Sequence, residues 1–172
     1  MSTEHSKIAL TRINSLDEEA FRAELHRCCA SKRWVELMLA RRPFTDDAAL
    51  LKAAEEIWFG LSREDWLEAF SHHPKIGNVE SLREKFQNTS QWAKNEQAAV
   101  GRASEETIKK LAEANQVYEN RFGYIFIVCA TGKSAEEMLA ILQNRLSNDP
   151  SEEIHIAARE QHKITCLRLM KL

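Results

Sequence analysis

The chain has 172 residues, 44% of them apolar, a length typical of one domain that buries most of its apolar surface. Five glycines and three prolines make up under 5% of it, against a usual combined share of about 12%. Glycine supplies the positive φ of tight hairpins and phosphate loops, so this scarcity argues against β-barrels, Rossmann folds and P-loops. We therefore predict a single all-α domain over residues 1–172, built from roughly eight helices.

The net charge and the cysteine spacing argue against further classes of protein. The formal net charge is −2, and no basic block indicates binding to nucleic acid or to an anionic membrane. No apolar run reaches the roughly 18–20 residues of a membrane span, and residues 1–12 lack the apolar core of a signal peptide. Cys28, Cys29, Cys129 and Cys166 match neither a C-x-x-C pair nor a disulfide framework. We expect reduced thiols and a cytoplasmic protein.

Polar caps and apolar stripes predict four helices in the first part of the chain. Ser15 begins a capping box, and Thr45 and Ser62 are candidate caps for the third and fourth helices. Gly60 ends the third helix, and the fourth must stop before Pro74, because proline disfavours the α conformation in the preceding residue. The four helices are expected over about residues 15–30, 32–40, 45–60 and 62–73.

Four more helices are predicted in the second part, over about residues 90–100, 104–121, 134–147 and 151–169. Gly101 is interpreted as a boundary between the first two, and Gly123 as the end of the second. Ser134 opens another capping box. The run Tyr124–Ala130 is rich in β-branched and aromatic residues but has no partner strand, so we expect a buried extended segment or a short helix.

The segment Ser71–Gly77 carries two adjacent histidines where a helix is forced to end. A histidine held by a stiff turn suits general acid or base catalysis, since its ordinary pKa lies near 6.5. His73 is preferred over His72, because only His73 is held extended by the following Pro74. The alternative is an exposed loop with two incidental histidines.

Glu96 and Gln97 are a second candidate pair. Adjacent helical residues point about 100° apart, so both can lie at the edge of a pocket but not at the middle of one face. There one would accept and the other donate a hydrogen bond to a bound ring. The alternative is a solvated helix face.

Two further candidates lie nearer the C-terminus. Gly123 followed by an apolar extended run offers backbone N–H groups to an anionic or imide-like ligand, unless it is simply a helix end that enters the core. Arg168, flanked by leucines, either extends to solvent or meets a carboxylate in a cleft. His155 and His162 are seven apart, which does not fit a helical metal site. Cys28 and Cys29 lie within a predicted helix and are not expected to supply a nucleophile.

Taken together and in order, these motifs resemble those of the OHCU decarboxylases, which act on 2-oxo-4-hydroxy-4-carboxy-5-ureidoimidazoline in urate breakdown. The likeness runs from about residue 14 to 170. It is carried by His-Pro-Lys-Ile-Gly (73–77), Trp-x-x-x-Glu-Gln (92–97), Asn-x-x-Tyr-x-x-Arg-Phe-Gly-Tyr-x-Phe (115–126) and Lys-Ile-x-x-Leu-Arg-Leu (163–169).

The resemblance implies an all-helical homodimer, without metal or organic cofactor, that releases CO2 and forms (S)-allantoin. It implies that His73 is the catalytic histidine and that Glu96 lines the catalytic site. It also implies substrate contacts from Pro74, Gln97, Arg168 and the backbone of Tyr124, Ile125, Phe126 and Ile127. Many members carry Ser three residues before the Glu, whereas this chain has Ala93, so a hydroxyl contact is missing or is supplied by water or another residue.

Several alternatives stay open at this point. His73 would either remove the hydroxyl proton or deliver the new C–H proton, and Glu96 would either orient His73 or repel the substrate carboxylate. The same scaffold would also suit decarboxylation or hydrolysis of a related ureido or hydantoin acid. A helical interaction module, with the His-Pro loop and the tryptophans as its binding surface, is the alternative outside enzymes.

Overall fold

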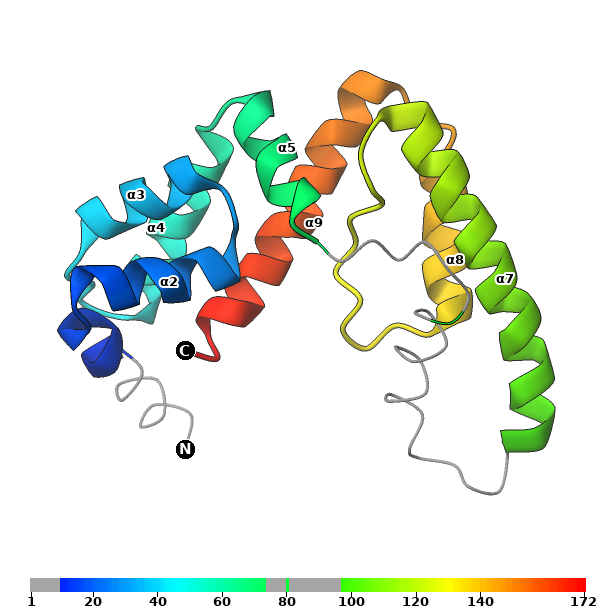
Figure 1. Ribbon diagram of the computed structural model, residues 1–172, viewed down its shortest axis with the longest axis horizontal. Helices are drawn as coiled ribbons and strands as arrows, with labels where there is room; N and C mark the ends of the chain where they lie inside the picture. Colours follow the sequence, from blue (N-terminus) through cyan, green and yellow to red (C-terminus); the bar gives the residue numbers. More distant parts are fainter. Residues whose placement is uncertain (1–9, 74–79, 81–96) are drawn as a thin grey trace. The chain divides into compact units, whose positions relative to one another are not determined.

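The computed structural model describes residues 10–73, 80 and 97–172, with the backbone alone for residues 97–104 (Figure 1). Residues 10–15 are helical. The helices with assigned bounds are α2 (Glu18–Cys28), α3 (Lys32–Arg41), α4 (Asp47–Phe59), α5 (Arg63–Ser71), α7 (Gln97–Phe122), α8 (Ala135–Arg145) and α9 (Pro150–Leu169). Within these ranges there is no β-strand, so the all-α prediction is confirmed.

Two of the predicted helix starts are confirmed in atomic detail. At α5, Ser62 accepts a hydrogen bond from the backbone N–H of Asp65, whose carboxylate accepts from the Ser62 N–H in return. Ser134 and Glu137 form the same reciprocal pair at α8. Each box satisfies backbone donors that the first helical turn leaves without an intrahelical partner.

Two other predicted caps are wrong by one or two residues. The cap of α2 is Asp17 rather than Ser15, whose hydroxyl instead donates to the Arg12 carbonyl oxygen at 2.9 Å. The cap of α4 is Asp46 rather than Thr45, and its carboxylate accepts from the Ala49 N–H at 2.7 Å. In both cases a carboxylate is the acceptor, because its negative charge is also stabilised by the helix dipole.

Gly101 does not end a helix, contrary to the prediction. α7 continues from Gln97 through Gly101 and Ser104 to Phe122. A glycine inside a helix costs about 1 kcal/mol relative to alanine, which a long helix tolerates. Gly123 does end it: its φ is +83°, and its N–H donates to the Glu119 carbonyl oxygen at 2.9 Å. Residues 125–130 that follow are neither helix nor strand.

The chain forms two compact units, residues 1–73 with 158–172, and residues 74–157. In the first unit α3 packs against α2, α4 and α5, and in the second α7 packs against α8. Figure 1 shows α7 and α8 running side by side. The single domain over residues 1–172 stays a prediction.

Tryptophans hold the first unit together. The buried Trp58 indole on α4 donates to the Ala158 carbonyl oxygen on α9 at 2.8 Å. The Trp66 indole on α5 donates to the Trp58 carbonyl oxygen at 2.9 Å. Each ring buries a large apolar area while its N–H is satisfied. Residue 58 therefore fixes both α5 and α9, the two helices that carry the site described below.

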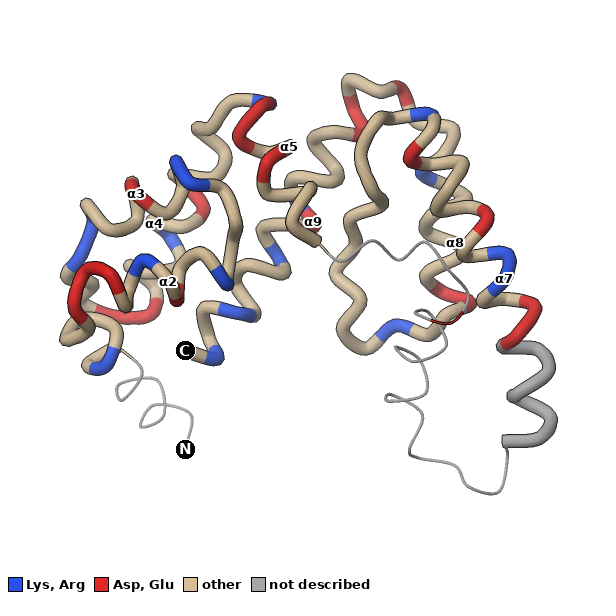
Figure 2. Tube along the Cα trace, in the orientation of Figure 1, with Lys and Arg blue, Asp and Glu red and all other residues tan. Residues whose placement is uncertain are grey.

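Charges of both signs are interspersed. Figure 2 shows both acidic and basic residues along the described part of α7, in keeping with the near-zero net charge. Of the helices that the structure describes, none combines the length and the apolar character needed to cross a membrane.

Candidate functional site

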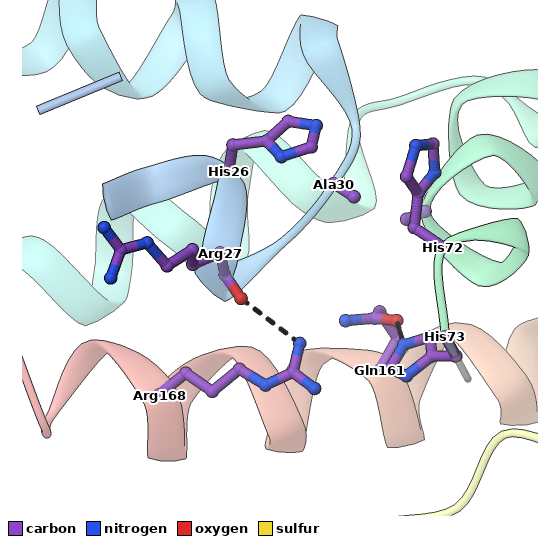
Figure 3. A pocket seen from close by; sticks show the side chains of 8 residues that line it. His26, Arg27, Ala30, His72, His73, Gln161 and Arg168 are labelled. Carbon is purple, nitrogen blue, oxygen red and sulfur yellow. Dashed lines mark hydrogen bonds between the residues drawn. The ribbon is translucent and has the colours of Figure 1, made fainter. Parts of the chain in front are cut away.

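A pocket opens in the first unit where α2, the end of α5 and α9 meet (Figure 3). Its volume is about 460 Å³, within the roughly 300–1,000 Å³ of small-molecule sites. The described residues that line it are His26, Arg27, Ala30, Ala69, His72, His73, Gln161 and Arg168. Two of the predicted site residues, His73 and Arg168, therefore line one pocket, although they are far apart in the chain.

His73 follows the last turn of α5, and its N–H donates to the Phe70 carbonyl oxygen at 3.2 Å. Its half-buried ring bonds through Nε2 to the Oε1 atom of Gln161, a contact drawn in Figure 3. Gln161 is only 1% exposed, and its Nε2 donates to the hydroxyl oxygen of Thr165 at 3.1 Å. That hydroxyl donates in turn to the Gln161 backbone carbonyl at 3.0 Å. The imidazole is thus held at the end of a buried polar chain.

His72 differs from its neighbour in every contact. It is exposed, it caps α5, and its Nδ1 lies 2.9 Å from the Glu68 carbonyl oxygen. The ring packs edge-on against His26 of α2, with centroids 5.6 Å apart. The two adjacent histidines therefore occupy different environments within one pocket.

Arg168 lies beside the C-terminal end of α2. Its Nη1 is 3.4 Å from the carbonyl oxygens of Arg27 and Cys28, the last residues of that helix. A cation is stabilised there by the partial negative charge of the helix end. Arg168 is exposed, as the predicted extension to solvent requires, and in addition it contacts these main-chain carbonyls. Its predicted pairing with a carboxylate in a cleft stays a prediction.

The pocket is electropositive. Arg27 and Arg168 contribute cations, and Nη2 of Arg27 lies 3.7 Å from Oε1 of Glu24. Among the described residues that line the pocket there is no carboxylate. An anionic ligand would meet the guanidinium of Arg168, whereas the charge of Arg27 is partly balanced by Glu24.

Tyr124–Ile127, the predicted backbone contacts, belong to the second unit. Tyr124 and Ile127 are buried, and the Ile127 carbonyl oxygen accepts from Nη1 of Arg145 at 2.7 Å. Arg145 is only 6% exposed and forms a 2.6 Å ion pair with Glu153, which is fully buried. The segment is thus fixed by a buried charged group.

The remaining predicted residues lie outside this description. Pro74, Ala93 and Glu96 fall outside the described residues, and Gln97 is the first residue of α7, with its backbone alone described. Their roles stay predictions.

Sequence reasoning missed Gln161 and Thr165. A usable signal exists, because residues 161, 165 and 168 are spaced by four and three and so share one face of a helix. Once Arg168 is a candidate, this spacing identifies Gln161 as a second polar residue on the same face of the helix.

Metal and thiolate chemistry find no support in the part of the chain that the structure describes. No group of three His, Cys, Asp or Glu side chains is arranged there to hold a metal ion. Burial raises the pKa of Cys28 to about 12 and that of Cys29 to about 11, so both are thiols at neutral pH. His162 packs against Phe59, and burial lowers its pKa.

Comparison with known proteins gives a consistent result. The family model described as OHCU decarboxylase matches residues 14–170. The "Uric acid degradation bifunctional protein TTL" of Arabidopsis thaliana is 40% identical over 146 residues, which cover 84% of this chain and 45% of that protein. The "2-oxo-4-hydroxy-4-carboxy-5-ureidoimidazoline decarboxylase" of Haloferax volcanii is 26% identical, with 95% of each chain covered. The chain thus spans less than half of the plant protein.

A solved structure agrees with these sequence matches. The crystal structure of an OHCU decarboxylase in the presence of (S)-allantoin superimposes with a TM-score of 0.69 and 38% identity. The match covers 86% of this chain and 95% of the other. Because the family match extends over nearly the whole sequence, this chain belongs to the OHCU decarboxylase family.

Proposed function

We propose that this protein is a decarboxylase that converts 2-oxo-4-hydroxy-4-carboxy-5-ureidoimidazoline to (S)-allantoin and CO2, the last step from urate to allantoin. The observation that carries the proposal is the joint presence of His73 and Arg168 in one cationic pocket. Relatives named for this reaction and for uric acid degradation support it. So does the likeness to an enzyme crystallised with (S)-allantoin.

The substrate's own structure explains why we propose no cofactor. One ring carbon carries both the carboxylate and the hydroxyl, and the neighbouring carbon is part of a C=N bond. When CO2 leaves, the electron pair of the broken bond forms a ring C=C, and the C=N pair moves onto nitrogen. That nitrogen takes up a proton from the medium. A second proton then adds to the ureido-bearing carbon while the hydroxyl proton is lost, which leaves the ring amide carbonyl of allantoin. The C=N bond is the electron sink.

Three tasks remain for the protein. It must hold the C–CO2 bond perpendicular to the ring π system, favour loss of the charged carboxylate, and direct one proton to one face of the product. Orientation alone supplies a large part of such rate enhancements. Removing the carboxylate from bulk water raises its energy more than that of a charge-dispersed transition state.

We assign His73 the proton transfer and Arg168 the binding of an anionic or carbonyl oxygen of the substrate. His73 is half-buried beside Gln161, and Arg168 lines the same pocket. Arginine is suited to this role because its planar guanidinium presents several donors to oxygen atoms.

The other assignments rest on the family motifs. Glu96 would orient His73 or repel the substrate carboxylate, with Pro74 and Gln97 beside it. The backbone N–H groups of Tyr124, Ile125, Phe126 and Ile127 would bind the ureido and ring oxygens. A homodimer and a cytoplasmic location are the remaining proposals, to be tested by sedimentation of the purified protein and by fractionation of cells.

The direct test generates the unstable substrate in situ from urate with the upstream enzymes and follows the optical activity of allantoin. Rapid gain of the (S) signal on addition of this protein is expected. The slow racemic background alone would contradict the proposed function and favour an interaction module.

In the same assay, His73→Asn is expected to lower kcat by at least about 100-fold, because the proton-transfer group is lost. His155→Asn, an exposed histidine on α9, is the matched control and should keep normal turnover. Near-normal turnover of His73→Asn with an unchanged circular dichroism spectrum would overturn the assignment.

A further inference from the structure

We propose that Gln161 is a positioning residue that fixes the tautomer of His73, so that Nε2 carries a proton and the lone pair of the neutral ring lies on Nδ1. The consequence for catalysis rests on the proposed function, whereas the tautomer itself does not. The argument follows the hydrogen atoms along the chain from Thr165 to His73.

The direction of the chain is set at Thr165. A threonine hydroxyl has one hydrogen, and here it is donated to the Gln161 backbone carbonyl at 3.0 Å. The Thr165 oxygen can therefore only accept from the Gln161 side chain, which lies 3.1 Å away. This requires the amide nitrogen of Gln161 to face Thr165 and its Oε1 to face His73.

The tautomer of His73 follows from that orientation. The Oε1 atom of Gln161 has no hydrogen, so it can only accept from Nε2 of His73. The bond therefore requires a proton on Nε2. Either proton transfer considered above would then use Nδ1, while Nε2 stays bonded to Gln161. Because Gln161 is 1% exposed, water cannot readily replace this bond.

His72 supplies an internal contrast. Its Nδ1 lies 2.9 Å from the Glu68 backbone carbonyl, which also only accepts, so His72 carries its proton on Nδ1. The Ser71 hydroxyl oxygen lies 3.3 Å from the same Nδ1. Its hydrogen is donated to the Glu68 carbonyl at 2.7 Å, so this oxygen also can only accept from His72. Adjacent histidines are thus expected in opposite tautomers.

The first test is heteronuclear NMR of the 15N-labelled full chain, with His72 and His73 assigned, at a pH where both rings are neutral. A protonated Nε2 in His73 and a protonated Nδ1 in His72 are expected. The proposal is overturned if His73 instead carries its proton on Nδ1. This readout does not depend on activity, so it stands even if the unmodified protein makes no allantoin.

Thr165→Val removes the hydroxyl and keeps the side-chain shape. The Gln161 amide then loses the acceptor that orients it, so the Nε2 preference of His73 should weaken. Thr165→Ser keeps the hydroxyl and should keep the tautomer. Equal tautomer populations in the two variants would contradict the proposed chain.

Gln161→Leu is expected to lower kcat by about 10- to 100-fold with less than about a threefold change in KM, because the imidazole is present but less well oriented. Gln143→Leu makes the same change at an exposed glutamine of α8 and should leave both constants unchanged. Unchanged kcat in a folded Gln161→Leu protein would overturn the positioning role.

Gln161→Glu keeps the acceptor and adds a negative charge beside the ring. An adjacent carboxylate favours the imidazolium, so the limb of the pH–rate profile that reports His73 should move to higher pH. A residue with a packing role alone would change stability without moving that limb. An unshifted profile in a folded, active Gln161→Glu protein would argue against the proposal, and this variant also serves if Gln161→Leu does not fold.

Discussion

The protein contains two clusters of polar side chains that differ in almost every respect. In the first unit, the His73 pocket is open to solvent and carries arginines without a carboxylate among the described residues of its lining. In the second unit, Tyr118, Arg145 and Glu153 are buried, and their charges balance. The pocket leaves cationic groups accessible to a ligand, whereas the polar groups of the buried cluster bond to one another.

The bonds within the buried cluster make this concrete. Glu153 accepts from the Tyr118 hydroxyl and from Nε of Arg145, each at 2.6 Å, and from Asn148 at 2.9 Å. The Arg145 guanidinium also lies over the Phe126 ring, 4.6 Å from its centroid. Burial and donation to Glu153 raise the pKa of Tyr118 well above its usual range, so it stays a phenol. Such a cluster is suited to holding the chain, and the pocket to chemistry.

The largest expected effect is in the buried cluster. Glu153→Gln leaves the Arg145 charge buried without its counter-ion, and removing one partner of such a pair costs about 3–5 kcal/mol of unfolding free energy. Glu152→Gln, its exposed neighbour on α9, should change stability by less than about 0.5 kcal/mol. Denaturant unfolding of both variants measures the difference. Equal stability would remove the distinction between the two clusters.

A smaller effect, and on binding rather than stability, is expected in the pocket. Arg168→Ala removes hydrogen bonds from a charged donor, worth about 1.5–3 kcal/mol, so KM should rise by about 10-fold or more. kcat should change little if substrate and transition state are bound alike. Steady-state kinetics gives both constants. An unchanged KM would indicate that Arg168 serves only the end of α2.

The smallest expected effect is on the pH dependence of stability, and it comes from His162, a histidine that does not line the pocket. Burial lowers the pKa of His162, although Glu55 partly opposes this, so the folded protein favours the neutral ring. The unfolded state then binds the proton first, and unfolding free energy should fall as pH drops below about 6.5 and through the folded pKa. His162→Gln should flatten this dependence, whereas exposed His155→Gln should not. Denaturant unfolding between pH 5 and 8 tests this, and equal slopes would contradict it.

Local rules predicted much of the fold. The capping boxes at Ser62 and Ser134 and the end of α7 at Gly123 depend on residues three or four apart, so a single sequence carries their signal. The prediction at Gly101 failed because the helical tendency of the surrounding residues outweighed one glycine.

Local sequence rules predicted less of the candidate site. His73 and Arg168 were singled out by local patterns, but only the family resemblance joined them, since helix periodicity says nothing about contacts across the chain. Gln161 resembles any polar residue of an amphipathic helix until the fold brings it to His73. The cluster of Tyr118, Arg145 and Glu153 likewise joins α7, α8 and α9 and has no local signature.

The register of α9 has a consequence for which changes this chain can accept. Ala158, bonded to Trp58, sets the helix in place, and Gln161, Thr165 and Arg168 follow on the same face. One inserted or deleted residue just after Ala158 would rotate all three side chains together by about 100°. Point substitutions there cost one contact at a time, whereas a change of length removes the whole set. Residues 158–168 should therefore accept substitutions at exposed positions but not insertions or deletions.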